Sequence, residues 1–222
     1  TAEGDTAIAV PISGGWYVYY MYASQNQAAA RNAIGASSVE QPFRNAVING
    51  DFSSDQEYAG GSQTVTAAAV FKSVADCWYG ISSGANLTAQ RVTQSDNTYR
   101  LRFTGAASVT LVAAGHRIRS DEVAARRMVG AKASIGVLLS SSSLTSITWR
   151  LYRANTINAL GTRPSPTRTL IQSGTFTITS TETRYTVTTT SVLPAEAANG
   201  LEIEFEGGAL LGTQTLTIGD VQ

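Results

Sequence analysis

The sequence predicts a mainly β protein whose larger part, from Asn45 to Gln222, is an antiparallel β-sandwich or barrel. Apolar and polar residues alternate there in many short segments. Turn residues separate these segments at intervals of about 8 to 12 residues, which is typical of sandwiches and barrels. The repeated helices that a parallel sheet of βαβ units requires are missing from this part of the sequence.

Each alternating segment places its apolar side chains on one face of a strand, because successive side chains point to opposite sides. The clearest is residues 147–152, in which Ile147, Trp149 and Leu151 share one face, opposite Arg150 and Tyr152. The other predicted strands are residues 99–103, 108–113, 175–179, 185–188, 201–206 and 216–220.

One short helix is expected to interrupt the strands, at residues 121–129. Ser120 can act as its N-cap, and acidic residues follow in the first turn. Arg126 and Arg127 lie in the last turn, and Gly130 comes after it. Both ends therefore complement the helix dipole.

The first part of the chain has a different character. Residues 16–22 are aromatic and β-branched without helical spacing, which predicts a strand. The Ala-rich residues 25–35 predict a helix, too short to be stable unless it docks on this chain or another. Residues 36–44 have the composition of a linker. We therefore expect two domains, an N-terminal segment at 1–44 and a β-sandwich at 45–222.

Composition argues against several partners. Sixteen basic residues balance sixteen acidic ones, so the basic excess needed to bind nucleic acid or an acidic membrane surface is missing. No run of about 18 apolar residues predicts a membrane span. Charged residues make up 14% of the chain, against roughly 25% in typical globular domains. This low charge indicates either a surface that packs against neighbours or a bias of codon usage.

Catalytic residues are sparse. The only histidine, His116, follows residues 113–115 and is expected in a turn at the surface, and no G-x-S-x-G motif occurs. The single cysteine, Cys77, excludes an intrachain disulfide and is expected to pack as a small buried hydrophobe. One histidine and one cysteine are too few to build a zinc site. We therefore expect no enzyme activity and no cofactor.

Three carboxylates on one predicted strand need separate consideration. Paired carboxylates about 5 to 9 Å apart can hydrolyse glycosides. Alternation alone, however, makes i, i+2 neighbours point the same way, and a solvated face requires charge. We therefore expect these side chains to be solvated or salt-bridged across strands. The carboxylates are Glu202, Glu204 and Glu206, and the expected partners are Arg100, Arg102 and Arg150.

Residues 24–38, SQNQAAARNAIGASS, resemble the Q-x-x-AR-x-x-IGA segment that recurs in bacteriophage tail-fibre and related virion proteins. The matching residues are Gln27, Ala30, Arg31, Ile34, Gly35 and Ala36. In those proteins the segment links an attachment region to a fibre or receptor-binding domain. The resemblance implies that residues 1–44 attach the chain to other virion proteins.

Residues 45–222 resemble jelly-roll carbohydrate-binding modules and their phage structural relatives. NAVINGDF (45–52) is similar to their opening strand, and VADCWYG (74–80) to their ADRW strand, with Cys77 where Arg is usual. The resemblance implies a two-sheet antiparallel jelly roll whose first and last strands lie near each other. Later segments that match in order are 147–155, 173–179, 198–205 and 215–222.

The same resemblance implies a function. The chain is expected to be a phage tail-fibre, spike or head-fibre protein, exposed on the virion, that contacts host-surface glycans as a homo-oligomer, with a trimer typical of such fibres. One alternative is a capsid or tail decoration protein with a structural role and no ligand. A more distant alternative is a carbohydrate-binding module of a secreted glycoside hydrolase.

Candidate ligand residues follow from the strand faces. Tyr152 and Arg150 share the face opposite Trp149 and are expected to be exposed, whereas Trp78 and Trp149 are expected in the core. Tyr79 points away from Trp78 and is a third candidate.

A calcium site is a weaker possibility that only the resemblance suggests. Carbohydrate-binding jelly rolls often hold calcium where the NGDF-type segment meets a terminal pair of aspartates. Asp51 and Asp220 match that pattern in part, but Gly219 stands where the other aspartate is usual. We therefore expect no bound metal, and Asp51 and Asp220 are the residues that would bind calcium if a site were present.

Overall fold

The computed structural model describes residues 5–12, 15–22, 45–68, 70–121 and 123–222. The chain divides into two compact units, Thr1–Arg44 and Asn45–Gln222. In the first unit, β1 (Asp5–Ile12) and β2 (Gly15–Tyr22) form an antiparallel hairpin. The strand predicted at 16–22 is β2, whereas the predicted helix and linker at 25–44 lie outside the described residues.

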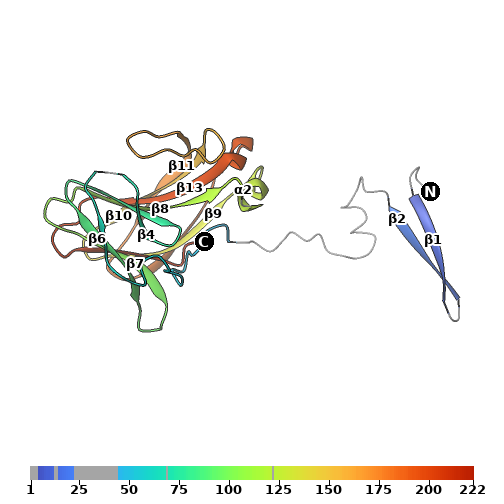
Figure 1. Cartoon of the computed structure of the whole chain (residues 1–222), viewed down its shortest axis with the longest axis horizontal. Helices are drawn as coiled ribbons and strands as arrows, with labels where there is room; N and C mark the ends of the chain where they lie inside the picture. The colour runs from blue at the N-terminus through green and yellow to red at the C-terminus, as the bar shows by residue number, and fades with distance from the viewer. Residues whose placement is uncertain (1–4, 13–14, 23–44, 69, 122) are drawn as a thin grey trace. The chain divides into compact units, whose positions relative to one another are not determined.

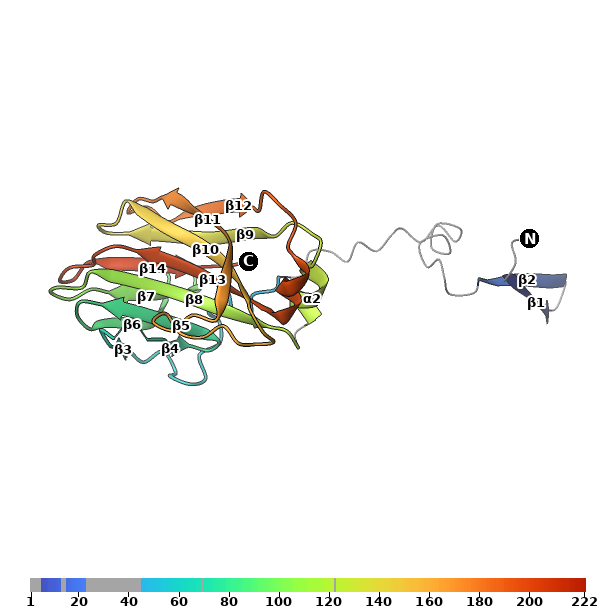
Figure 2. The same ribbon diagram turned by 90° about the horizontal axis from the view of Figure 1, so that it is seen from above.

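The second unit consists, within the described residues, of two antiparallel sheets of six strands each, shown in Figures 1 and 2. Sheet 1 has the order β11 (Arg168–Thr177), β10 (Ser146–Ala154), β13 (Gly200–Gly207), β8 (Leu111–Arg119), β5 (Trp78–Ser83) and β4 (Lys72–Ala75). Sheet 2 has the order β12 (Thr183–Thr188), β9 (Ser134–Ser141), β14 (Thr215–Gly219), β7 (Tyr99–Thr104), β6 (Leu87–Thr93) and β3 (Gln63–Val65).

The chain crosses repeatedly from one sheet to the other. The steps β7 to β8, β8 to β9 and β9 to β10 each change sheet. Figure 2 shows the corresponding strands of the two sheets over one another, from β11 and β12 at one edge to β4 and β3 at the other. The predicted antiparallel jelly-roll sandwich is confirmed. No helix in the described residues is long and apolar enough to cross a membrane.

The core lies between the sheets and follows the alternation of the strands. Trp149 and Leu151 of β10, and Ile203 and Phe205 of β13, belong to one cluster of buried apolar side chains. Trp78 is also in this cluster, so both tryptophans expected in the core are there. Arg150 and Tyr152, and the glutamates of β13, consequently lie on the outer face of sheet 1.

Helix α2 (Val123–Met128) is the helix predicted at 121–129, but it begins two residues later. Asp121 therefore precedes the helix, whereas Arg126 and Arg127 lie in its last turn as expected. Gly130 follows with a φ of 74°, a left-handed conformation that suits a glycine after a helix. A short 3-10 turn, η1 (Ala195–Asn199), precedes β13.

The two ends of the second unit meet, as the resemblance implies. Val221 N donates to Gly50 O at 2.9 Å, and Asn45 Nδ2 donates to Val221 O at 3.2 Å. A Cβ on Gly50 would lie 2.0 Å from Val221 O, so only glycine fits there. The strand expected at 45–52 is wrong, because Asn49 and Phe52 have φ values of 53° and 56°. Such left-handed residues turn the chain and cannot continue a pleated strand.

Residues 74–80 likewise contain a turn where a single strand was expected. Asp76 and Cys77 connect β4 to β5, and Cys77 has a φ of 67°. Its side chain is exposed, so the expected buried thiol is wrong. Asp76 fixes the neighbouring loop: its carboxylate accepts from Gln56 N at 2.8 Å and from Ser54 Oγ at 2.6 Å. These hydrogen bonds lower the pKa of Asp76.

Candidate functional site

The outer face of sheet 1 carries a group of paired charges, the Arg–Glu network. Its carboxylates come from one strand, β13, and its guanidinium groups come from β8, β10, the connection between β10 and β11, and β11. Glu202 and Glu204 have no exposed surface, so of the two expected states, solvated or salt-bridged, they adopt the salt-bridged one. The members are Glu202, Glu204, Glu206, Arg117, Arg150, Arg163 and Arg168.

Glu202 is bonded on both carboxylate oxygens. Arg117 Nε, from β8, donates to Glu202 Oε2 at 2.7 Å. The Tyr79 hydroxyl, from β5, donates to Glu202 Oε1 at 2.7 Å. Arg168 Nη1 contacts the same oxygen as a close ion pair without an aligned hydrogen bond. Glu202 is therefore compensated although it is fully buried, as a buried carboxylate must be.

The other two glutamates share their partners. Arg163 Nη2 lies 2.9 Å from Glu204 Oε1 and also contacts Glu206 Oε2. Arg150 Nη2 donates to Glu206 Oε1 at 3.0 Å. Burial would raise the pKa of Glu206, but the hydrogen bonds from Arg163 and Arg150 outweigh burial and leave this pKa below its usual value. Glu206 is therefore a stable carboxylate.

Of the three expected cross-strand partners, only Arg150 is in the network. Arg100 and Arg102 lie on β7, which belongs to sheet 2, so their expected pairing with the β13 glutamates is wrong. Arg100 Nε instead lies 2.7 Å from Glu182 Oε2, and Arg102 is exposed.

A long connection between β10 and β11, residues 155–167, folds over the network. Thr162 N donates to Ser165 O at 3.1 Å in its turn, and Gly161 forms a bridge to Pro166. Arg163 extends from this turn to the β13 glutamates, and Arg117 Nη2 donates to Gly161 O. The connection is therefore fixed to the face of sheet 1 by charged contacts at two points.

Aromatic rings flank the charges. The Phe71 and Tyr79 rings stack with centroids 4.2 Å apart, and the Arg117 guanidinium lies 4.3 Å from the Phe71 centroid. The Arg168 guanidinium lies 4.3 Å from the centroid of the half-buried Tyr152 ring. Cations over aromatic faces are attracted by the ring quadrupole, so these contacts hold both arginines and rings in place.

The structure thus brings the three candidate ligand residues onto one face, but in different states. Arg150 and Tyr152 are partly exposed. Tyr79 is 7% exposed and lies against Phe71, so it positions Glu202 rather than facing solvent. Phe71, Arg117, Arg163 and Arg168 are missing from the sequence prediction. Arg117 lies in β8, beyond the end of the strand predicted at 108–113. Phe71 and Arg163 lie outside strands and Arg168 is the first residue of one, so no alternation marks their position.

His116 is placed differently from its prediction. It lies within β8, is 1% exposed, and faces the core next to Trp78, so the expected surface turn is wrong. The preceding Gly115 lies within the same strand and does not form a turn. The residue must be glycine because a Cβ there would lie 2.1 Å from the Tyr79 hydroxyl oxygen. Glycine at this position allows the Tyr79 side chain to approach the backbone of the strand.

The hydrogen bonds of His116 define its protonation state. Nε2 accepts from Ile48 N at 3.3 Å, so the ring proton is on Nδ1, which donates to Cys77 O at 3.0 Å. Burial lowers the pKa of His116 to about 4, although the bond to Cys77 O acts in the opposite direction. The imidazole is therefore neutral at pH 7.

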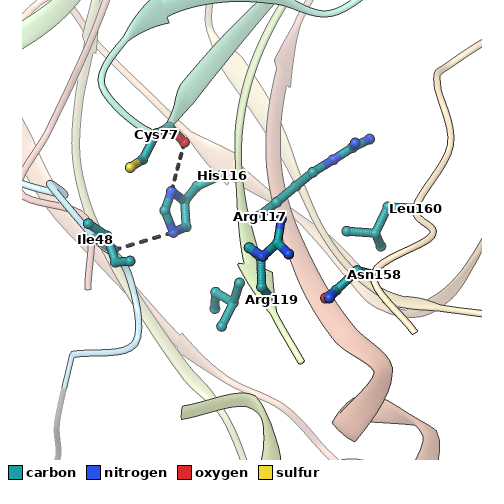
Figure 3. Close-up of a pocket in the computed structure, with 8 residues that line it drawn as sticks. Ile48, Cys77, His116, Arg117, Arg119, Asn158 and Leu160 are labelled. Atoms are coloured by element: carbon teal, nitrogen blue, oxygen red, sulfur yellow. Dashed lines mark hydrogen bonds between the residues drawn. The ribbon is translucent and has the colours of Figure 1, made fainter. Parts of the chain in front are cut away.

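A pocket of about 310 Å³ lies beside this histidine. Figure 3 shows His116 bonded to Cys77 and Ile48, with Arg117, Arg119 and Asn158 further along the pocket. The described residues that line it include no carboxylate, so His116 has no Asp or Glu partner for a catalytic triad there.

Asp51 and Asp220, the residues considered for calcium, each have partners within the protein. Asp51 Oδ1 accepts from Ser53 N at 3.2 Å and from Ser53 Oγ at 3.0 Å. The Asp220 carboxylate is paired with Arg184 and accepts from Gln222 Nε2 at 3.0 Å. Both carboxylates are thus engaged within the protein. In the described part of the chain, no group of three or more His, Cys, Asp or Glu side chains is arranged to hold a metal.

No family model and no curated protein matches the sequence. Among solved structures, a CBM4 structure has 16% identity and a TM-score of 0.46, and the match covers 79% of this chain and 97% of that one. A putative sugar binding protein from Bacteroides thetaiotaomicron has 9% identity and a TM-score of 0.49, with 81% and 98% covered. The enzymatically active domain of tailspike protein 4 from bacteriophage CBA120 has 12% identity and a TM-score of 0.45, with 65% and 19% covered.

Proposed function

We propose that the Asn45–Gln222 unit is a non-catalytic carbohydrate-binding module whose ligand lies on the outer face of sheet 1. The observation that carries this proposal is the position of Tyr152 and Arg150, side by side on β10 above the Arg–Glu network. A sugar site needs an apolar ring face and polar groups held in fixed positions. Both are present on this face.

The network supplies the fixed polar groups. Arg150 is held by Glu204 and Glu206, and Tyr152 by the Arg168 guanidinium. Side chains that are already ordered lose little conformational entropy when a ligand binds, which favours affinity. Buried ion pairs therefore act as a support for the ligand-facing groups.

The same geometry argues against glycoside hydrolysis. A general acid needs a carboxyl group with a raised pKa. The pKa of Glu206 is lowered instead, and Glu202 and Glu204 are buried beneath arginines. We therefore propose binding without catalysis.

We further propose that the module belongs to a bacteriophage tail fibre, spike or head fibre and contacts host-surface glycans. The support is the sequence resemblance of residues 24–38 to virion attachment segments, together with the ordered matches along 45–222. In this proposal residues 1–44 bind other virion proteins, and the chain assembles as a homo-oligomer, with a trimer expected, on the particle surface.

A decoration protein without a ligand is the second candidate. The observation that favours it is the completeness of the network, in which both fully buried glutamates are already paired with arginines. Such a face is stable when nothing binds to it. The two candidates differ in one measurable property, which is specific glycan binding.

The test is binding of the full chain to a glycan array and to host cells. Tyr152→Ala should weaken binding by about tenfold or more, since central aromatic contacts dominate binding energy. Tyr99→Ala is the matched control, because Tyr99 is also a half-buried strand residue with an arginine over its ring, but on sheet 2. An array and host cells without any specific binding would favour the decoration protein.

A further inference from the structure

We propose that the glycan bound by this face is anionic and carries carboxylate, phosphate or sulfate groups. This inference rests on the proposed function and narrows its ligand class. It follows from the depth at which the two kinds of charge lie in the Arg–Glu network, and from the hydrogen-bonding groups that remain for a ligand.

The negative charges of the network lie deeper than three of its four positive charges, and the fourth arginine, Arg168, is 4% exposed. The side chains of Glu202 and Glu204 are 0% exposed, and that of Glu206 is 19% exposed. The side chains of Arg117, Arg150 and Arg163 are 32%, 24% and 23% exposed. A ligand approaching the outer face of sheet 1 therefore meets guanidinium groups before it meets carboxylates.

The net charge of the network is also positive. Within the network, four arginines against three glutamates leave one positive charge in excess. The chain as a whole has a formal net charge of zero. The excess is therefore a property of the network, and it can be tested against arginines elsewhere on the surface.

Donor groups remain on the shallow arginines. Among the described residues, Arg163 bonds to Glu204 and Glu206 only through Nη2. Its Nε and Nη1 can therefore donate to a ligand. Arg117 uses Nε and Nη2 for Glu202 and Gly161, which leaves Nη1. These remaining N–H groups are single charged donors, and a charged donor bonds more strongly to a carboxylate, phosphate or sulfate oxygen than to a neutral acceptor.

Acceptor groups, by contrast, are few. A neutral sugar offers hydroxyl groups that donate as well as accept, and sites for such sugars supply acceptors. The carboxylate oxygens of Glu202 and Glu204 are covered by arginines and by the Tyr79 hydroxyl. Of the three carboxylates of the network, only Glu206 is partly exposed. An anionic group only accepts hydrogen bonds, so it suits this face better.

The experiment compares sugars that differ only in charge. The probes are alginate, polygalacturonate and hyaluronan, each beside its carboxyl-reduced form, and dextran sulfate and dextran phosphate beside dextran. Binding of the full chain is measured by calorimetry at low salt. We expect at least one acidic member to bind about tenfold or more tightly than its neutral counterpart. The carboxylate, sulfate and phosphate pairs show which anion is preferred.

Substitutions of Arg163 and Arg102 distinguish anion binding at this face from a general attraction of anions to surface arginines. Arg163→Gln should weaken binding of the acidic member by about tenfold more than it weakens binding of the neutral counterpart. Arg163→Lys should recover part of the loss, because it keeps the charge but not the fixed Nε and Nη1 donors. Arg102→Gln is the matched control, because this substitution removes the same charge from an exposed position on sheet 2. A cooperative unfolding transition in urea verifies that each variant is folded.

The outcomes distinguish this inference from the function on which it rests. Neutral forms that bind as tightly as the acidic forms would overturn the anionic ligand and leave carbohydrate binding intact. Equal losses in Arg163→Gln and Arg102→Gln would also overturn it, because the attraction would then be general. If neither class binds, either here or on the glycan array, the carbohydrate-binding function itself fails.

Discussion

His116 couples the segment before β3 to the middle of sheet 1 through two hydrogen bonds of opposite sense. Nδ1 donates to Cys77 O, and Nε2 accepts from Ile48 N. A second proton on the ring would sit on Nε2 and face the Ile48 N–H, which is also a donor. The buried imidazole therefore favours its neutral form, and burial lowers its pKa to about 4.

This pKa makes the stability of the fold depend on pH in a defined window. The folded-state pKa of about 4 is below 6.5, the ordinary value for histidine, so below pH 6.5 the unfolded chain binds a proton that the folded chain does not. The free energy of unfolding should be constant above that pH and fall by about 2 kcal/mol between pH 7 and pH 5. Urea unfolding at a series of pH values measures it.

Two observations check the assignment. The lowered carboxyl pKa values of Glu206 and Asp76 act only below about pH 4.5, so the window between pH 5 and 6.5 reports His116 alone. His116→Gln should flatten the curve in that window. The imidazole proton signals of the only histidine should also titrate by NMR with a midpoint near 4. A midpoint near 6.5 would show that the ring is open to solvent.

At the scale of elements, alternation determined which residues share a face but not what covers that face. It placed Trp149 inside and Arg150 outside on β10, and the three glutamates together on β13. It could not show that Glu202 and Glu204 are buried. The residues that cover them, Arg163 and Arg168, come from the β10–β11 connection and the start of β11, about 40 residues earlier in the chain. Such a long-range contact leaves no periodic signal.

Glycine and asparagine explain the misplaced elements. Gly115 resembles a turn residue in the sequence, yet it is required because the Tyr79 ring approaches the strand closely. Asn49 lies in an apparent strand, yet it adopts left-handed backbone and its Nδ2 donates to Ser54 O at 2.8 Å and Asp76 O at 3.0 Å. In both cases the deciding partner is distant or non-periodic, so local pattern alone cannot reveal it.

Removal of one buried glutamate of β13 should destabilise the fold strongly, because its arginine partners would lose their compensating charge. Glu204→Gln removes one charge from beneath Arg163 and Arg168, and it leaves their positive charges without full compensation. Breaking a buried ion pair by removing one partner typically costs about 3 to 5 kcal/mol. We expect a loss of about 3 kcal/mol in the free energy of unfolding, measured with urea at pH 7.

An exposed pair provides the control for this prediction. Arg119 Nε lies 3.1 Å from Asp121 Oδ1, and the two side chains are 62% and 63% exposed. Asp121→Asn breaks that pair with the same change of charge and should leave the unfolding midpoint unchanged, because solvent screens such pairs. Equal effects of the two substitutions would contradict the buried network.

At the scale of the whole molecule, the second unit holds its own core. Among the described residues, every member of the buried apolar cluster lies between Phe52 and Val221. The contacts between residues 45–52 and the C-terminal end close the sandwich: Val221 N donates to Gly50 O, and Trp78 Nε1 donates to Asn49 O at 3.1 Å. The stable unit should therefore begin at Asn45 and should not tolerate a later start.

Two truncations that differ by eight residues test this boundary. Residues 45–222 should unfold cooperatively with the same free energy of unfolding as the full chain. Residues 53–222 lack Phe52, which is fully buried, and the hydrogen bonds to His116, Trp78 and Val221. Loss of a buried phenylalanine alone costs about 3 to 5 kcal/mol, so this shorter chain should be strongly destabilised in urea. If 45–222 were as unstable as 53–222, the first unit would have to contribute to the fold of the second.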